Sequence, residues 1–171
     1  SWVTNLRGAD IDCNPLFISY LLIRKNSATL YINKAKVPSD IGQALQAEGI
    51  ALAEYASVFA DIAELDSVWL APNSTNRAIF QHLDGTCRVH SAASPVALMK
   101  AVKNDAELQG FHQAMLYDGI AMVKFLHWLK PAVEAGGQTE CSIVRQLDRL
   151  RAEHEGYRGV SFDTIAGYQA H

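Results

Sequence analysis

The chain has 171 residues, of which 49% are hydrophobic and 19% are charged, as in an ordinary globular protein. Its net charge of −3, with no polybasic run, argues against a nucleic-acid partner and against a membrane-surface partner. The longest apolar run, residues 15–23, is shorter than the roughly 20 residues that a membrane-spanning helix needs, so we expect no transmembrane segment.

The first predicted elements along the chain are two neighbouring strands. Residues 17–25 and 28–34 are rich in β-branched and aromatic side chains, and Asn26 and Ser27 lie between them. Strands separated by so short a polar connection pair with each other. The pattern therefore predicts a β-hairpin with its turn at these two residues.

Helices and strands alternate over the rest of the first half. Ser39 is expected to cap a helix that Gly49 ends. Helices between strands require crossover connections, so the pattern predicts an α/β fold with a mixed sheet. In chain order the predicted elements are a helix at 39–48, a strand at 50–55, a helix at 58–65, a strand at 67–71, a helix at 75–83 and a strand at 86–90.

The second half predicts a long helix after a connector at residues 94–105. Asn104 and Glu107 have the spacing of a capping box, in which each side chain accepts a hydrogen bond from the other residue's backbone N–H. Pro131 and the following glycine pair are expected to end this helix. One helical face is predicted to carry the apolar residues Leu108, Phe111, Met115, Met122, Phe125 and Leu129.

A second helix and a strand are predicted to close the chain. Thr139 is placed to cap the helix, and Glu140 complements its dipole. Its apolar stripe comprises Ile143, Leu147 and Leu150, and Gly156 stops it. A buried strand is then expected near residues 160–166, with Gly167 as its turn and with a partner strand to follow.

Histidine and cysteine residues are the first candidates for a metal site. His82, Cys87 and His90 are close in sequence and could bind zinc, but no second pair of ligands lies nearby. His112 and His127 lie on the long predicted helix, about 22 Å apart along its axis, so they cannot share one ion. Structural roles are therefore favoured for all of these histidines.

The acidic loop near the N-terminus superficially suggests calcium binding through Asp10, Asp12 and Asn14. It lacks the turn glycine and the final bidentate glutamate of a calcium loop, so we do not expect calcium there. Arg7 and Asp10 could instead form an ion pair across this loop, or face a site.

No complete catalytic motif is present among the residues taken by themselves. The sequence has no G-x-S-x-G, no phosphate-binding glycine loop and no H-E-x-x-H. Three widely spaced cysteines, an odd number, fit reduced thiols in a cytoplasmic protein better than a disulfide framework.

Four segments together resemble the Xaa-Pro aminopeptidases (aminopeptidase P). Residues 2–23, "WVTNLRGADIDCNPLFISYLLI", resemble a block that precedes the catalytic domain of that family. Residues 94–129 resemble its linker and first catalytic-domain helix, and "QTECSIVRQLDRLR" at 138–151 resembles its second helix. "SFDTIAG" at 161–167 resembles its first catalytic strand.

The resemblance implies an α/β accessory domain of the creatinase N-terminal type, with a mixed sheet, over residues 1–93. A linker follows at 94–105. Residues 106–171 correspond to the start of a pita-bread α+β catalytic domain, namely two helices and a strand. This catalytic domain is incomplete within the chain.

The resemblance also implies metal-assisted removal of the N-terminal residue from peptides with proline in second position. The family holds two divalent ions, with manganese as the usual metal, on two Asp, one His and two Glu that follow the matched segments. None of these ligands is assigned here, and His171 falls before the family's catalytic histidine and receives no role. We therefore expect the fragment alone to be inactive.

Only accessory roles remain for residues of this chain. Arg7 and Asp10 match the family's motif, so the resemblance places them at the edge of the substrate pocket. It further implies a cytoplasmic homodimer that acts on Xaa-Pro peptides, without a nucleic-acid or membrane partner. A non-catalytic scaffold, or a prolidase-like or creatinase-like hydrolase, remains an alternative, although the "NLRG" and "NP" elements favour the aminopeptidase.

The two predicted helices of the second half carry apolar stripes that need cover. In the family that the chain resembles, these helices pack on the pita-bread sheet, most of which this chain is expected to lack. We expect the stripes to be exposed and the chain to self-associate, unless the stripes cover each other or the first domain.

Overall fold

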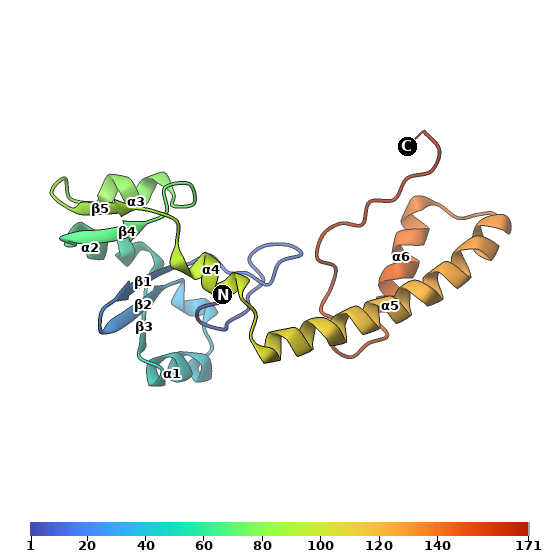
Figure 1. Ribbon diagram of the computed structural model, residues 1–171, viewed down its shortest axis with the longest axis horizontal. Helices are drawn as coiled ribbons and strands as arrows, with labels where there is room; N and C mark the ends of the chain where they lie inside the picture. The colour runs from blue at the N-terminus through green and yellow to red at the C-terminus, as the bar shows by residue number, and fades with distance from the viewer. Residues whose placement is uncertain (171) are drawn as a thin grey trace. The chain divides into compact units, whose positions relative to one another are not determined.

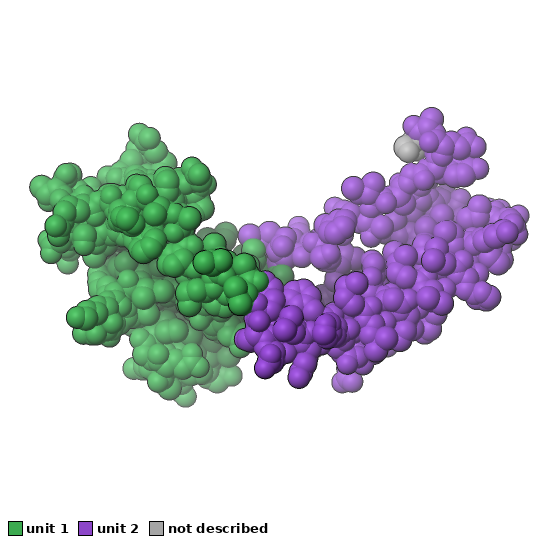
Figure 2. All heavy atoms as spheres, viewed as in Figure 1, with its two compact units in different colours: residues 1–10, 15–102 green, residues 11–14, 103–171 purple. Residues whose placement is uncertain are grey.

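The computed structural model describes residues 1–170 (Figure 1). They form two compact units: residues 1–10 with 15–102, and residues 11–14 with the chain from 103 onward (Figure 2). Compact units need not coincide with domains. The division into residues 1–93, 94–105 and 106–171 therefore stays a prediction.

The first unit contains the expected hairpin. β1 (Tyr20–Arg24) pairs antiparallel with β2 (Ser27–Tyr31), and Arg24 lies opposite Ser27. The two turn residues are therefore Lys25 and Asn26, one position earlier than predicted. β2 also pairs in parallel with β3 (Ile50–Ala53), which confirms the predicted mixed sheet, in the order β1-β2-β3.

The crossover from β2 to β3 runs through α1 (Ser39–Ala47). Ser39 is the first residue of this helix and not its cap: Pro38 takes the cap position, without a side-chain hydrogen bond. The predicted cap at Ser39 is therefore wrong, and the fixed backbone of proline, which favours the start of a helix, is the physical reason. Gly49 ends the helix as predicted, with a φ of 78° that favours glycine.

A second, two-stranded sheet completes the first unit. β4 (Ser67–Leu70) pairs in parallel with β5 (Arg88–Ser91). The predicted alternation is confirmed, with shorter elements than expected. The helices are α2 (Val58–Ala63), after a 3-10 turn at Tyr55–Ser57, α3 (Arg77–His82) and α4 (Pro95–Ala101), which lies in the predicted connector.

Two apolar clusters form the core of the first unit. Tyr31 of β2 is fully buried with side chains of α2 and α3, and its hydroxyl donates to Asp61. Burial, and then the neighbouring Asp61 carboxylate, raise the pKa of Tyr31. Leu30 and Ile32 pack against Leu45 of α1 on the other face of the sheet. This alternation along β2 is what a strand covered on both faces requires.

The second unit is dominated by α5 (Asp105–Glu134). The capping box is confirmed: Asn104 Oδ1 accepts from the Glu107 N–H, and Glu107 Oε2 accepts from the Asn104 N–H, both at 2.9 Å. The prediction that Pro131 ends the helix is wrong. Its carbonyl still accepts a hydrogen bond from Ala135 at 3.0 Å, so only one backbone bond is lost at the proline.

α6 (Glu140–Arg151) packs beside α5. Thr139 caps it as predicted, because its Oγ1 accepts from the Ser142 N–H at 3.2 Å. Arg151 Nε lies 2.6 Å from Asp118 Oδ1 of α5, and the buried apolar residues of the pair are Leu147 of α6 and Ala121 and Phe125 of α5. Ion pair and apolar contact together hold the two helices.

The predicted strand at residues 160–166 is wrong. These residues form no strand, and every paired strand of the described chain lies between Tyr20 and Ser91. An extended segment becomes a strand only when a neighbour accepts and donates its backbone hydrogen bonds. The mixed-sheet α/β region followed by two helices is confirmed. His171 lies outside the described residues.

Candidate functional site

The loop that carries Arg7 and Asp10 is a tight reversal of the chain. The N–H of Gly8 donates to the Pro15 carbonyl at 3.4 Å, and the N–H of Asp10 donates to the Leu16 carbonyl at 3.1 Å. A Cβ atom on Gly8 would lie 2.6 Å from the Cβ of Phe17. Only glycine allows the two arms of the loop to approach this closely.

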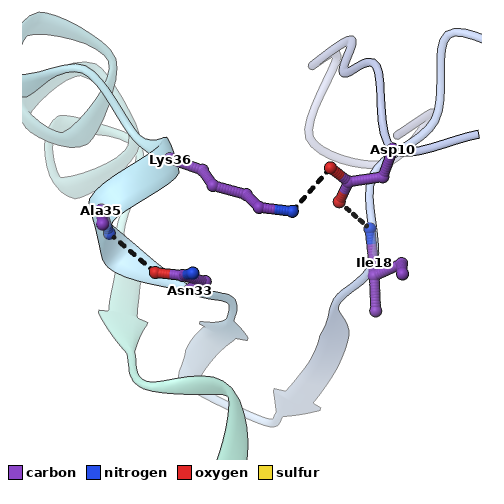
Figure 3. Close-up of polar contacts among 5 residues, drawn as sticks. All are labelled: Asp10, Ile18, Asn33, Ala35 and Lys36. Atoms are coloured by element: carbon purple, nitrogen blue, oxygen red, sulfur yellow. Dashed lines mark hydrogen bonds and ion pairs between the residues drawn. The ribbon is translucent and has the colours of Figure 1, made fainter.

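Asp10 anchors this loop to the hairpin region of the first unit (Figure 3). Its Oδ2 accepts from the Ile18 N–H at 2.9 Å, and its Oδ1 lies 2.6 Å from Lys36 Nζ. The Asp10 side chain is only 17% exposed, whereas that of Lys36 is 48% exposed. Lys36 is itself fixed in a short 3-10 helix, Lys34–Lys36, which Asn33 caps by accepting from the Ala35 N–H at 3.1 Å (Figure 3).

The electrostatics of Asp10 follow from these two partners. The hydrogen bond from Lys36, and then the backbone N–H of Ile18, hold the pKa of Asp10 below its ordinary value, although partial burial opposes them. The carboxylate is therefore charged at neutral pH and has both oxygens engaged. Asp10 positions the loop and has no oxygen left that lacks a partner.

Arg7 lies exposed on the same loop, and its Nη1 donates to the carbonyl of Leu6 at 3.1 Å. Of the two alternatives for Arg7 and Asp10, the ion pair across the loop does not form, because Asp10 pairs with Lys36 instead. Lys36 is 26 residues from Asp10 in sequence, and no local motif pointed to it. Only the fold of the hairpin brings the two charges together.

The tip of the loop does not form a calcium cage. Asn14 Nδ2 donates to the backbone carbonyl of Asp12 at 3.3 Å, and Cys13 has a positive φ of 60°. Asp10 is committed to Lys36. Asp10 and Asn14 therefore each have hydrogen-bond partners within the protein.

His82 and His90, the two histidines near β5, each pack against an aromatic ring. The ring of His82 lies 4.5 Å from that of Phe59, and its Nδ1 is 2.8 Å from the Ala78 carbonyl. The ring of His90 meets Trp69 edge to face at 4.8 Å. Over residues 1–170, no group of three or more His, Cys, Asp and Glu side chains gathers where it could hold a metal ion.

The second unit contains two cavities against α6, of about 860 and 710 Å³. The larger is lined by the paired side chains of Asp118 and Arg151 and by the rings of Tyr117 and His154, which are in contact and tilted by 33°. Tyr157 also lines it and donates to Asp148. Burial, and then that carboxylate, raise the pKa of Tyr157 to about 12. Asp118 and Arg151 neutralise each other, whereas Arg158, which also lines this cavity, donates to the backbone carbonyls of Glu155 and Tyr157.

The described helices also include none that combines the length and the apolar character needed to cross a bilayer.

Comparison with known proteins gives consistent matches. The model of the creatinase/prolidase N-terminal domain matches residues 1–107. A probable Xaa-Pro aminopeptidase P of Sordaria macrospora is 32% identical over an alignment of 180 positions, which covers 97% of this chain and 29% of the relative. Xaa-Pro aminopeptidase ApepP of Drosophila melanogaster is also 32% identical and covers 97% of this chain.

A solved structure matches the fold as well. The crystal structure of an X-prolyl aminopeptidase from Caenorhabditis elegans, described as a cytosolic enzyme with a di-nuclear active site, aligns with a TM-score of 0.87. Sequence identity is 31%, and the alignment covers 97% of this chain and 28% of that one. The chain thus spans less than a third of the length of these relatives.

Proposed function

This chain belongs to the creatinase/prolidase N-terminal domain family, and from that membership we propose that it is part of a metal-dependent aminopeptidase. The enzyme would remove the N-terminal residue from peptides that have proline in second position. One observation carries the proposal: 97% of the chain aligns with proteins named Xaa-Pro aminopeptidase, in sequence and in fold. A function of the chain alone is not implied, since the relatives are more than three times as long.

The proposed enzyme holds two divalent metal ions, with manganese as the metal. The di-nuclear site of the C. elegans relative supports the number of ions. Residues 1–170 do not fit such a pair, because no three-ligand group gathers among them. We therefore assign no catalytic step and no metal ligand to this chain, and we expect the 171-residue chain by itself to be inactive.

Within that enzyme, the proposed contribution of this chain is the edge of the substrate pocket. Asp10 and Lys36 fix the loop, and the exposed guanidinium of Arg7 is the group that reaches substrate. Only one of its hydrogen bonds, to the Leu6 carbonyl, is formed within the loop. A guanidinium has five donors, so it retains the capacity to bind a peptide carbonyl or carboxylate.

Peptides with an N-terminal Xaa-Pro sequence are the proposed partners, and the proposed assembly is a homodimer in the cytoplasm. The description of the C. elegans relative as cytosolic supports the location. The acidic balance of the chain, −3 at pH 7, supports the absence of nucleic-acid and anionic membrane partners.

Peptidase kinetics test the function and the role of Arg7 together. In a complete enzyme that contains this chain, Arg7→Ala is expected to lower kcat/KM for an Xaa-Pro peptide by roughly tenfold, the loss of one charge-assisted hydrogen bond. Arg77→Ala, on the exposed side of α3, is the matched control and is expected to leave kcat/KM unchanged. Unchanged kinetics in Arg7→Ala would remove the pocket role.

The same assay distinguishes the alternatives. A complete protein that is inactive with manganese on every Xaa-Pro peptide would favour a non-catalytic scaffold. Activity only on free Xaa-Pro dipeptides would favour a prolidase. Turnover by the isolated 171-residue chain would contradict the assignment of the metal ligands to other segments.

A further inference from the structure

The turn that follows α6 is held in part by the side chain of His154. The backbone N–H of Gly156 donates to Nδ1 of this imidazole at 3.0 Å, two residues along the chain. The His154 N–H donates to the Arg151 carbonyl at 3.3 Å, and the Tyr157 N–H donates to the His154 carbonyl at 2.9 Å. The ring of His154 therefore takes part in the hydrogen bonding of the turn together with its backbone.

The bond from Gly156 determines the protonation state of the imidazole. A backbone N–H can only donate, so Nδ1 of His154 is an acceptor and carries no proton. The neutral ring then holds its single proton on Nε2. A doubly protonated imidazole has two donors and no acceptor, and it cannot make this bond. Protonation of His154 and closure of the turn therefore exclude each other.

Close packing keeps the ring in this position. His154 is half-buried, and the centroid of its ring lies 3.4 Å from that of Tyr117 of α5. A Cβ atom on Gly156 would lie 2.8 Å from Cε1 and 3.0 Å from Nδ1 of the imidazole. Glycine at this position therefore allows the backbone to approach the ring closely enough for the hydrogen bond.

The neighbouring acidic and basic groups of α5 and α6 are engaged with other partners. Asp118 of α5 lies 2.6 Å from Arg151 of α6, and Asp148 of α6 accepts from the Tyr157 hydroxyl. Burial, and then that carboxylate, raise the pKa of Tyr157 to about 12, with a smaller contribution from Cys13. The Tyr157 hydroxyl therefore keeps its proton at every pH at which a histidine titrates.

The turn itself adds three charged side chains, those of Glu153, Glu155 and Arg158. Glu153 Oε2 lies 2.5 Å from Lys124 Nζ of α5, and Arg158 Nη1 donates to two backbone carbonyls of the turn, at 3.1 Å each. Two carboxylates against one guanidinium leave this segment acidic, so it can accommodate a positively charged ring. Loss of the hydrogen bond, and not repulsion between cations, is therefore what protonation of His154 causes.

We propose that the turn after α6, residues 152–158, is a pH-sensitive switch with His154 as its sensor. The neutral ring accepts from Gly156 and closes the turn. As the pH falls through the range in which histidines titrate, about 8 to 5, the ring takes up a proton, the bond is lost and the turn opens. Among the side-chain types of residues 152–158, only histidine ordinarily titrates in this range. The switch does not depend on the peptidase activity proposed above.

Opening of the turn acts on the wall of the larger cavity in the second unit. His154 and Tyr157 both line that cavity, and the chain continues along it through residues 158–162. The hydrogen bond from Gly156 lies at the start of this segment. A proton on His154 therefore releases the first residues of the cavity wall.

Nuclear magnetic resonance of the 171-residue chain tests the sensor. At about pH 8 the ring-nitrogen shifts of His154 should report the neutral Nε2–H tautomer, and the amide shift of Gly156 should move as the ring titrates. His154→Asn is the matched variant, because an asparagine oxygen can accept from the N–H two residues on and does not titrate. In this variant the Gly156 amide shift should stay constant between about pH 8 and pH 5.

Proteolysis by endoproteinase Glu-C tests the opening, because cleavage after Glu155 requires the turn to open. At about pH 5 we expect this cleavage to be roughly fivefold faster in the wild type than in His154→Asn, the equivalent of one net hydrogen bond. At about pH 8 the two proteins should be cleaved at the same rate. Comparing both proteins at each pH removes the pH dependence of the protease itself.

Gly156→Ala tests the packing without changing His154. Its methyl group should displace the ring, so that His154 loses its single tautomer at about pH 8. Gly119→Ala is the control: no atom lies within 4 Å of its Cβ position, and the tautomer should be kept. Circular dichroism verifies the fold of each variant.

Three results would each overturn the proposal. The first is an Nδ1–H tautomer of His154 in the wild type at about pH 8. The second is a Gly156 amide shift that does not follow the titration of His154. The third is equal cleavage of the wild type and His154→Asn after Glu155 at both pH values.

Discussion

At the scale of single residues, Asp10 shows how one carboxylate organises a loop. It accepts from the Ile18 N–H and from Lys36, and both partners stabilise its charged form. Gly8 permits the close approach that brings Asp10 to these partners. The loop therefore holds the backbone of Arg7 in a fixed place, as the proposed role of Arg7 in contacting a peptide substrate requires.

Replacing Asp10 by Asn should lower the thermal midpoint of unfolding at about pH 7, because the ion pair with Lys36 is lost. The folded state holds the pKa of Asp10 below its ordinary value of 3.8. The stabilisation is therefore present above that value and is lost as the pH falls through the lower native pKa. Thermal unfolding followed at several pH values should show the wild type and Asp10→Asn converging in strong acid.

The control for this prediction is Asp12→Asn, two residues along the same loop and exposed. It should not change the midpoint at neutral pH. A difference between wild type and Asp10→Asn that persists unchanged at about pH 2 would argue that lost packing, not lost charge, causes the effect.

At the scale of elements, capping explains where the helices of the second unit begin. Asn104 and Thr139 each satisfy a backbone N–H that the first turn of a helix leaves without a partner. α5 then continues through Pro131, and the glycine pair Gly136 and Gly137, with φ values of 81° and 78°, follows its end. The capping box therefore marks where α5 begins, whereas Pro131 does not mark where it ends.

Asn104→Ala should destabilise the chain by about 1 kcal/mol, the usual loss for removing an N-cap side chain. Urea unfolding followed by circular dichroism measures the change, and Asn104→Asp, which keeps an acceptor, should restore most of the stability. Gln109→Ala, exposed on the same helix, is expected to be neutral or slightly stabilising. Equal losses in Asn104→Ala and Asn104→Asp would show that the stability does not come from the side-chain acceptor at the cap.

At the scale of the whole molecule, the two units differ in how many large apolar side chains they bury. The first unit has seven buried large apolar residues: Leu30, Tyr31, Ile32, Leu45, Val58, Ile62 and Ile79. The second has Phe125 and Leu147, with Ala121 beside them. Since burial of apolar surface is the main favourable term in folding, the first unit has the larger share of the stabilisation.

Hydrogen exchange should reflect this difference. Amides of β2 (Ser27–Tyr31) are expected to exchange more slowly than amides in the middle of α6 (Glu140–Arg151), because local opening of the second unit exposes less apolar surface. The measurement belongs at low protein concentration, where the proposed dimer is dissociated. Equal protection of the two elements would contradict the expected order of stability.

The alternation of helix and strand signals predicted the mixed sheet. Local patterns by themselves determined the hairpin, the capping box of Asn104 and Glu107, the Thr139 cap and the glycine that ends α1. Each depends on residues within a few positions of one another, and short-range hydrogen bonds or backbone sterics enforce them. Only the tertiary structure decided that Asp10 pairs with Lys36 and not with Arg7, and that residues 160–166 stay unpaired. Both outcomes depend on which distant backbone and side-chain groups come within reach, and such contacts have no fixed spacing in the sequence.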